Sequence, residues 1–344
     1  MKKIKKFLLI ILIIILLAAA AVIVYIQLHG SFAGEYYSAN QDISPENTFI
    51  VQSGTDVSAH RMGGGIFPED TMMAAKGLIS DIENGEYNID IVEMDLWMTK
   101  DGQLILLHDD TLDRTTDSLD VFGIENARPG DYTLEELGEL NFAENFVAED
   151  GSTPYKGLRG DDVPEDLRVV SLDRILDYLT SNGDFKYIFE IKNSGNEGIK
   201  AMDRLVETVR DYDLAEKAML TSFNEEVLRH LDENYSDLTR NASMSEVVKF
   251  YVDFLLNKDP GECDYPYDVL IITPRYGVFT GTEENGRLHG LLNLSSQGII
   301  NRAHECGMAI YYWTINDEPT MQKLIDRNAD GIITDYPNRV SPLF

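Results

Sequence analysis

The sequence predicts an α/β fold in which eight parallel strands and their helices form a TIM (β/α)8 barrel. From about residue 57 onward, short apolar, β-prone segments alternate with segments of helical periodicity. Eight strand-like segments occur, which is the number that closes a parallel barrel. An open doubly wound sheet is the alternative, but it needs a glycine-rich phosphate turn that the sequence does not carry in the right place.

The elements are predicted in chain order from apolar runs and helix-capping residues. Asp70, Asn224 and Asp317 stand at predicted helix starts, where a side-chain oxygen can accept a hydrogen bond from a free backbone N–H. The predicted helices include residues 70–82, 198–212, 225–233, 295–306 and 318–327. The predicted strands are residues 57–60, 91–97, 187–191, 218–223, 238–243, 268–273, 309–314 and 331–334.

One stretch departs from the regular alternation of strands and helices. The segment 99–102 (Thr-Lys-Asp-Gly) is a turn signal, so we expect the second strand to return as a hairpin through residues 103–107. The hairpin brings His108 back toward the end of the second strand. Residues 117–170 are polar and acidic with scattered Gly and Pro, and we interpret them as a small insertion near the barrel mouth.

The N-terminus carries a strong targeting signal. Four lysines precede an uncharged apolar run, Phe7 to Ile26, which is long enough to cross a bilayer as a helix. We therefore expect cytoplasmic lysines and a transmembrane anchor in residues 1–30, a stalk in residues 31–52 and the barrel in residues 53–344. The lysines predict a single-pass cell-membrane protein, with the membrane as a partner and an extracytoplasmic barrel. A cleaved signal peptide is the alternative.

Composition excludes one class of partner. The chain has 344 residues, with 29 basic and 59 acidic side chains and a net charge of −30. Such a surface repels nucleic acid and favours divalent cations. The two cysteines, Cys263 and Cys306, show no metal-site spacing, and their redox state stays open.

Carboxylates cluster at the predicted ends of two strands. Glu93 and Asp95 are separated by one residue, so a strand places both on one face while their apolar neighbours face the helices. Glu190 and Lys192 share a face of the next strand. Hard oxygen ligands of this kind suit one divalent metal, Ca²⁺ or Mg²⁺. The structural alternatives are an outward polar edge for the first pair and an internal salt bridge for the second.

Two histidines are candidates for proton transfer. His60 and His108 each follow a predicted strand, and each is adjacent to another ionisable residue, Arg61 or Asp109. Histidine titrates near neutral pH, and arginine can grip a phosphate in a forked geometry. With the carboxylates, these residues indicate a metal-assisted phosphoryl-transfer site.

In order and spacing, the motifs resemble those of the glycerophosphodiester phosphodiesterase family, within the phospholipase-C-like barrels. The match runs from about residue 57 to residue 340. Its components are His60-Arg61, Pro68-Glu69, Glu93-Met94-Asp95, Lys100-Asp101-Gly102, His108-Asp109, the run 111–116, Glu190-Ile191-Lys192, Ser222-Phe223, Trp313-Thr314-Ile315-Asn316 and the run 330–337.

The resemblance implies metal-dependent hydrolysis of glycerophosphodiesters to an alcohol and glycerol phosphate, with a small-molecule phosphodiester as the substrate. Its implied metal ligands are Glu93, Asp95 and Glu190. Its implied general acid and base are His60 and His108, in an order left open. Its implied substrate contacts are Arg61, Glu69, Lys192 and Trp313. The alcohol moiety and the oligomeric state stay open.

Two positions depart from the family's pattern. Met62 replaces the glycine after His-Arg and removes backbone freedom where the chain bends. Asp70 replaces the asparagine after Pro-Glu and can still cap a helix. Because no metal ligand or base is lost, an enzyme is favoured over a non-catalytic cell-envelope binding module on the same barrel. A lysophospholipid or phosphatidylinositol phosphodiesterase would use nearly the same site.

Overall fold

A computed structural model describes residues 21, 24–25, 47–276, 281–282, 288–289 and 292–343. The barrel strands are β1 (Asp56–Ala59), β2 (Ile91–Met98), β4 (Lys186–Ile191), β5 (Ala218–Thr221), β6 (Thr239–Arg240), β7 (Val269–Ile272), β12 (Ala309–Tyr312) and β13 (Gly331–Thr334). Short strands beside them are β3 (Leu104–Leu106), β8 (Arg275–Tyr276), β9 (Gly281–Thr282), β10 (Leu288–His289) and β11 (Leu292–Asn293). Each predicted barrel strand overlaps an observed one.

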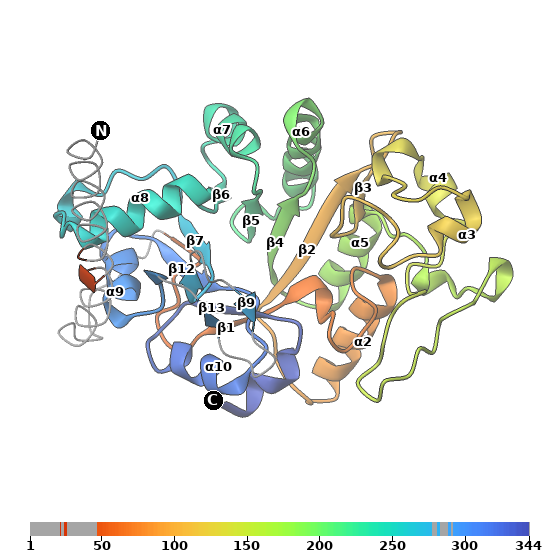
Figure 1. The fold of residues 1–344 in the computed structure, drawn as a ribbon. Helices are drawn as coiled ribbons and strands as arrows, with labels where there is room; N and C mark the ends of the chain where they lie inside the picture. Colours follow the sequence, from red (N-terminus) through yellow and green to blue (C-terminus); the bar gives the residue numbers. More distant parts are fainter. Residues whose placement is uncertain are drawn as a thin grey trace, which may run out of the picture.

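Helices surround the strands (Figure 1). They are α2 (Met72–Glu83), α3 (Ser118–Phe122), α4 (Leu134–Leu137), α5 (Leu172–Asn182), α6 (Gly195–Asp211), α7 (Glu225–Asn234), α8 (Met244–Leu255), α9 (Gln297–Glu305) and α10 (Glu318–Ile325). Asn224 caps α7 and Asp317 caps α10, as predicted. At α2 the cap is Thr71, whose hydroxyl accepts from the Ala74 N–H, and Asp70 precedes it.

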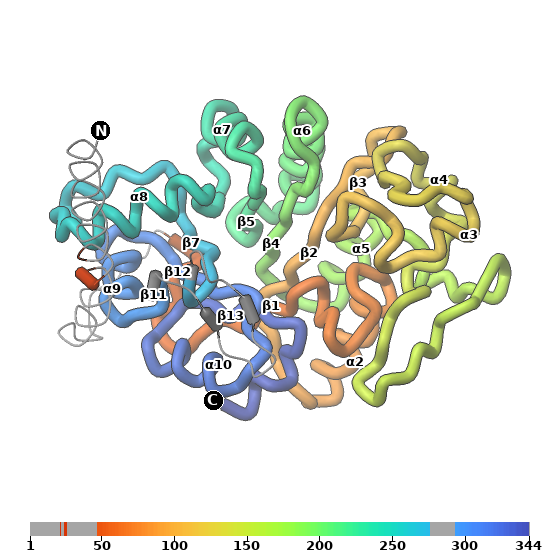
Figure 2. The backbone as a smooth tube through the Cα atoms, in the orientation of Figure 1, coloured from red at the N-terminus to blue at the C-terminus, as the bar shows by residue number. Residues whose placement is uncertain are grey.

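The eight barrel strands are parallel and form a nearly closed sheet. Their order is β6-β5-β4-β2-β1-β13-β12-β7. The first and last strands of the chain, β1 and β13, therefore lie side by side (Figure 2). The two ends of the order meet where Asn241 bridges to Val269 and the Ala242 N–H donates to the Val269 carbonyl at 2.8 Å. This topology confirms the predicted TIM-type barrel, and β3 returns antiparallel on β2 as the predicted hairpin.

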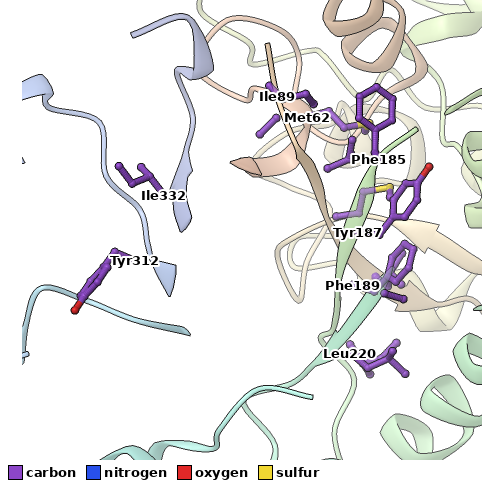
Figure 3. Packing of buried hydrophobic residues seen from close by; sticks show 14 of the residues in the cluster. Met62, Ile89, Phe185, Tyr187, Phe189, Leu220, Tyr312 and Ile332 are labelled. Atoms are coloured by element: carbon purple, nitrogen blue, oxygen red, sulfur yellow. The ribbon is translucent and has the colours of Figure 1, made fainter. Parts of the chain in front are cut away.

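Side chains of the strands alternate between two apolar layers. Val92, Met94 and Leu96 of β2 pack between the barrel and the helices, as the strand period requires. Phe189 of β4 belongs to the same outer layer (Figure 3). The interior layer consists of Phe49, Ile50, Ile91, Ile188, Met219, Val269, Ala309, Tyr311 and Ile333.

Part of the predicted stalk belongs to the packed body of the protein. Phe49 is fully buried, and its carbonyl accepts a hydrogen bond from the Tyr311 hydroxyl at 3.1 Å. The Asn47 side-chain amide donates to the carbonyls of Asp268 and Gly307. Apolar residues preceding β1 thus cover the amino-terminal end of the barrel, where burial contributes to stability.

The segment 117–170 lies between β3 and α5 and packs a small core of its own. Leu137, Leu140 and Phe142 gather with Ile105 of the β2–β3 hairpin. Among the residues that the structure describes, none that lines the cavity discussed below comes from this segment.

A disulfide joins Cys263, which precedes β7, to Cys306, which follows α9. Their Cα atoms are 5.5 Å apart, and 43 positions separate them in sequence. A covalent link of this kind restricts the unfolded chain and so favours the folded state.

The prediction of a single-pass cell-membrane protein is wrong for the part of the chain that the structure describes. A helical crossing needs about 20 consecutive apolar residues, and none of the described helices reaches that length with that character. The longest of them, α6, has 17 residues and carries charges along its exposed face. The predicted anchor lies outside the described residues except at positions 21, 24 and 25.

Met62 shows how a side chain is accommodated at the family's glycine position. Arg61 and Met62 have φ angles of 50° and 58°, and this left-handed conformation costs about 1–2 kcal/mol for a residue with a Cβ. The Met62 side chain is fully buried in the outer apolar layer, near Ile89 (Figure 3). Burial of a large apolar side chain offsets the backbone cost.

We expect Met62→Gly to lower the free energy of unfolding by about 1–3 kcal/mol, because a cavity in place of a buried Met costs about 2–5 kcal/mol and the relieved backbone returns only part of that. Denaturant unfolding monitored by circular dichroism measures the change. A variant more stable than the wild type would show that backbone relief outweighs packing at this position.

Candidate active site

The predicted carboxylates meet at one end of the barrel because β2 and β4 are adjacent. Asp95 is in register with Glu190 across the two strands, and Glu93 is in register with Ile188, which points into the barrel. Glu93 and Asp95 are 4% and 1% exposed. The interior face of the barrel thus gathers three acidic groups from two strands.

Two cationic side chains hold these carboxylates, Arg61 from the turn after β1 and Lys192 from the end of β4. Arg61 approaches Asp95 Oδ2 with Nε at 3.1 Å, and its backbone N–H donates to Glu93 Oε2 at 2.7 Å. Lys192 Nζ lies 2.9 Å from Asp95 Oδ1 and 2.6 Å from Glu190 Oε1. Burial raises the pKa of Glu190, while Lys192 opposes that rise. Asp95 therefore sits between the two cationic groups suited to a phosphate.

His60 is oriented by a residue from the other end of the chain. Its Nδ1 donates to Asp335 Oδ1 at 2.6 Å, and Asn316 donates to the second oxygen of that carboxylate at 2.7 Å. Burial opposes ionisation of Asp335, but the bond and charge of His60 outweigh it and lower the pKa of Asp335. The free Nε2 of His60 then faces Glu93, 3.9 Å from Oε2. Asp335 and Asn316 are site residues beyond those predicted from the sequence, although Asp335 directly follows β13 and Asn316 ends the motif Trp313-Thr314-Ile315-Asn316.

His108 repeats this arrangement with its neighbour in sequence. Its Nδ1 donates to Asp109 Oδ1 at 2.6 Å, and Arg114 holds the other oxygen of Asp109 at 2.5 Å. Burial lowers the pKa of His108, and the charges of Lys192 and Arg61 lower it further against the opposing charge of Asp95. A neutral imidazole at neutral pH can accept a proton at Nε2.

Glu69 lies beside these groups, bound by two arginines. Its carboxylate accepts from Arg61 at 3.1 Å and from Arg114 at 2.6 and 2.8 Å. Burial raises the pKa of Glu69, but the hydrogen bonds and charges of Arg114 and Arg61 outweigh it, so the net shift is downward. Glu69 thus positions the two arginines. Arg114 is a site residue that the sequence analysis did not single out.

A cavity of about 440 Å³ opens over this cluster, within the range of small-molecule sites. Six of the predicted site residues line it, namely His60, Glu93, His108, Glu190, Lys192 and Trp313. The other three, Arg61, Glu69 and Asp95, do not line it. Asp95 contacts the lining through Lys192, Arg61 contacts it through its backbone N–H on Glu93, and Glu69 is joined to Arg61.

The residues present fit a divalent metal ion. One ligand atom each from His60, Glu93 and Asp95 can be chosen within 4.8 Å of one another. Burial raises the pKa of Glu93 well above its usual value, and the charges of Asp95 and Asp70 raise it further. A bound cation would remove this repulsion, and carboxylate oxygens suit Ca²⁺ or Mg²⁺. The compact group differs from the predicted set, because it contains His60 and does not contain Glu190.

Asp70 is a buried carboxylate with no hydrogen-bond partner on either oxygen. It is 4% exposed, and its φ of 55° matches the left-handed conformation that asparagine and aspartate tolerate. Burial raises the pKa of Asp70 well above its usual value, and the charges of Asp95 and Glu69 add to the rise. The aspartate therefore destabilises the metal-free site, whereas an asparagine would carry no charge.

We expect Asp70→Asn to raise the free energy of unfolding of the EDTA-treated protein at pH 7 by about 1–3 kcal/mol, the cost of an unsatisfied buried group. The raised pKa means that the wild type loses stability as pH rises above about 4, the unfolded value of the carboxyl. The gain should therefore shrink toward pH 4. Chemical denaturation at pH 7 and at pH 4 measures this gain in the free energy of unfolding. A variant less stable than the wild type at pH 7 would show that the Asp70 carboxylate has a stabilising partner.

Comparisons with known proteins show the family to which the chain belongs. The model of the glycerophosphoryl diester phosphodiesterase family matches residues 60–339. The uncharacterized protein YqiK of Bacillus subtilis is 27% identical, covering 84% of this chain and 98% of its own. A glycerophosphodiester phosphodiesterase of Caldanaerobacter subterraneus is 25% identical, covering 82% and 95%. An Oleispira antarctica phosphodiesterase, solved with sn-glycerol-3-phosphate, matches with a TM-score of 0.57 at 19% identity, covering 84% and 96%.

The match defines a phosphoric diester hydrolase on a TIM-type barrel. The chain belongs to the glycerophosphoryl diester phosphodiesterase family. The family assignment and the predicted enzyme class are thereby confirmed.

Proposed function

We propose that this enzyme hydrolyses glycerophosphodiesters to an alcohol and glycerol phosphate by metal-assisted acid–base catalysis with two histidines. The observation that supports this most is the pair of carboxylate-bound imidazoles on one cavity. His60 and His108 both line the cavity. Each donates a hydrogen bond from Nδ1 to an aspartate, so that Nε2 is left for the substrate. A hydrolysis needs a proton taken from water and a proton given to the leaving alkoxide.

The proposed ligands of one divalent metal are Glu93, Asp95 and Glu190, and Ca²⁺ and Mg²⁺ both suit them. When bound, such an ion supplies charge for the phosphate and activates an oxygen nucleophile. The register of β2 and β4 supports this set of ligands, because it brings the three acidic groups onto one interior face.

Arg61 and Lys192 would bind the phosphate oxygens, since both reach the cluster while offering several N–H donors. Glu69 would keep Arg61 and Arg114 in place through its ion pairs. Trp313 would form an apolar wall for the substrate, because it lines the same cavity. One histidine would then take the nucleophile's proton while the other protonates the leaving oxygen.

We expect His60→Ala and His108→Ala each to lower kcat about 10²–10⁴-fold on glycerophosphocholine, the usual contribution of a general acid or base. Release of glycerol phosphate measures turnover, and circular dichroism checks folding. His230→Ala is the matched control, because His230 also pairs with an aspartate, Asp203, at 2.6 Å but lies on α7 away from the cavity. Full turnover by either cavity variant would refute the mechanism.

Metal removal tests the proposed ligands separately. EDTA should abolish turnover, and Ca²⁺ or Mg²⁺ should restore it. A metal at 100-fold its Kd should also stabilise the folded protein by about 2.7 kcal/mol, and Glu93→Gln should lose this stabilisation. Thermal unfolding with and without metal measures the effect, with the exposed Glu83→Gln as the control. An unchanged response of Glu93→Gln would remove Glu93 from the metal site.

A further inference from the structure

The turn that precedes α2 places one more carboxylate beside the acidic cluster. Asp70 lies in this turn, and its backbone N–H donates to the Arg61 carbonyl at 3.4 Å. The Arg61 N–H in turn donates to Glu93 Oε2 at 2.7 Å. On the other side of Asp70, the Thr71 hydroxyl donates to the Pro68 carbonyl at 2.7 Å and accepts from the first turn of α2. The backbone of Asp70 is therefore held from both sides, and Arg61 alone connects it to a proposed metal ligand.

The Asp70 carboxylate has no cation or N–H group of its own. Among the residues that the structure describes, neither of its oxygens has a hydrogen-bond partner, although the residue is only 4% exposed. The two nearby cations, Arg61 and Lys192, pair with other carboxylates of the site. Buried charges in proteins are normally paired or lie at a metal ion. The surroundings of Asp70 therefore suit a protein in which a cation is bound close by.

Charge links Asp70 to the proposed ligands. Burial raises the pKa of Asp70, and of the neighbouring charges that of Asp95 raises it most. Burial and the charge of Asp95 raise the pKa of Glu93, and the charge of Asp70 adds to this rise. In the part of the chain that the structure describes, Asp70 belongs neither to the compact group of His60, Glu93 and Asp95 nor to the lining of the cavity. Its charge thus acts on the site from outside the group of possible ligand atoms.

The charges of the cluster determine what an additional anion does there. The three proposed carboxylate ligands face two cations, so one negative charge remains when all five groups are ionised. Asp70 makes this two, the charge that one divalent ion neutralises. An asparagine, as in the family's pattern, would leave the metal-loaded cluster with a net positive charge. Because opposite charges attract and like charges repel, aspartate favours the cation, whereas asparagine favours a phosphate anion.

We propose that Asp70 tunes this site through its charge, without being a metal ligand: it strengthens the binding of the divalent cation and weakens the binding of phosphate anions. A phosphate monoester such as the product carries a charge of about −1.5 to −2 at neutral pH, whereas a phosphodiester carries one negative charge. The weakening is therefore greatest for the product, so that Asp70 favours metal retention and product release together. This inference rests on the proposed function, because it uses the proposed metal ligands and product.

Cation binding to the full-length protein, stripped of metal with EDTA and dialysed, tests the first effect. We expect Asp70→Asn to weaken the binding of Ca²⁺ and of Mg²⁺ about ten-fold or more at pH 7, because one charge close to the ion is lost. Asp70→Gly suits the φ of 55° at this position and should weaken binding by the same factor, since it lacks the same charge. Isothermal titration calorimetry measures both affinities, and circular dichroism checks folding.

Asp117→Asn is the matched control for these titrations. Asp117 is also 4% exposed and also has an unpartnered oxygen, but it lies in the segment 117–170 and does not line the cavity. Its neutralisation should leave the affinity for both cations unchanged. Glu93→Gln, which alters a proposed ligand, should abolish the binding of both cations.

Product inhibition tests the second effect. At saturating Ca²⁺ or Mg²⁺, glycerol phosphate should inhibit Asp70→Asn about three-fold or more strongly than it inhibits the wild type, because a repelling charge is removed. A structural disturbance of the site would weaken the binding of cation and anion alike. Opposite changes in the two affinities are therefore specific to a role through charge.

The outcomes separate this inference from the proposed function. Unchanged cation binding by Asp70→Asn, or weaker inhibition of that variant by glycerol phosphate, would overturn the inference and leave the proposed function standing. A much larger loss of cation affinity in Asp70→Gly than in Asp70→Asn would make the side-chain oxygen a ligand and would also overturn it. A wild-type protein that binds neither Ca²⁺ nor Mg²⁺ would overturn both.

Discussion

The burial of Asp95 between Arg61 and Lys192 is the interaction on which the rest of the site depends. Asp95 is 1% exposed and lies on β2, while its two cationic partners come from the turn after β1 and the end of β4. A buried carboxylate needs opposite charge, because removing one partner of such a pair typically costs about 3–5 kcal/mol. The three neighbouring strands must therefore hold their register for the charges to balance. The same register places Glu93 and Glu190 on the interior face, where excess negative charge is suited to a cation.

Each histidine donates a hydrogen bond from Nδ1 to a carboxylate, and this bond fixes the orientation of the ring while Nε2 stays available. Asp335 and Asp109 occupy Nδ1 of His60 and His108, so each ring keeps one direction and leaves Nε2 for the cavity. The supporting contacts extend one step further, through Asn316 to Asp335 and through Arg114 to Asp109. In the proposed mechanism, histidines oriented in this way would need no rearrangement when the substrate binds.

The kinds of side chain at the barrel mouth differ between the early and the late strands of the chain. The early strands β1, β2 and β4 end in ionisable side chains, whereas cavity residues associated with β5, β7 and β12 are apolar or carry small hydroxyls, namely Thr221, Ser222, Phe223, Ile271, Ile272, Thr273 and Trp313. Because a parallel barrel brings all carboxyl ends to one rim, the two kinds of surface meet in one cavity.

Local patterns in the sequence determined the strands, the hairpin and the shared face of Glu93 and Asp95, because strand period and turn chemistry act over a few residues. The family motifs gave the order of the site residues. Long-range partners required the tertiary structure: His60 and Asp335 are 275 positions apart, and Glu69 meets Arg114 across 45. Side-chain partners depend on how distant backbones approach, which no local period encodes. For the same reason, only the fold showed that Thr71 caps α2, that Phe49 closes the barrel base and that Asp70 is buried without a partner.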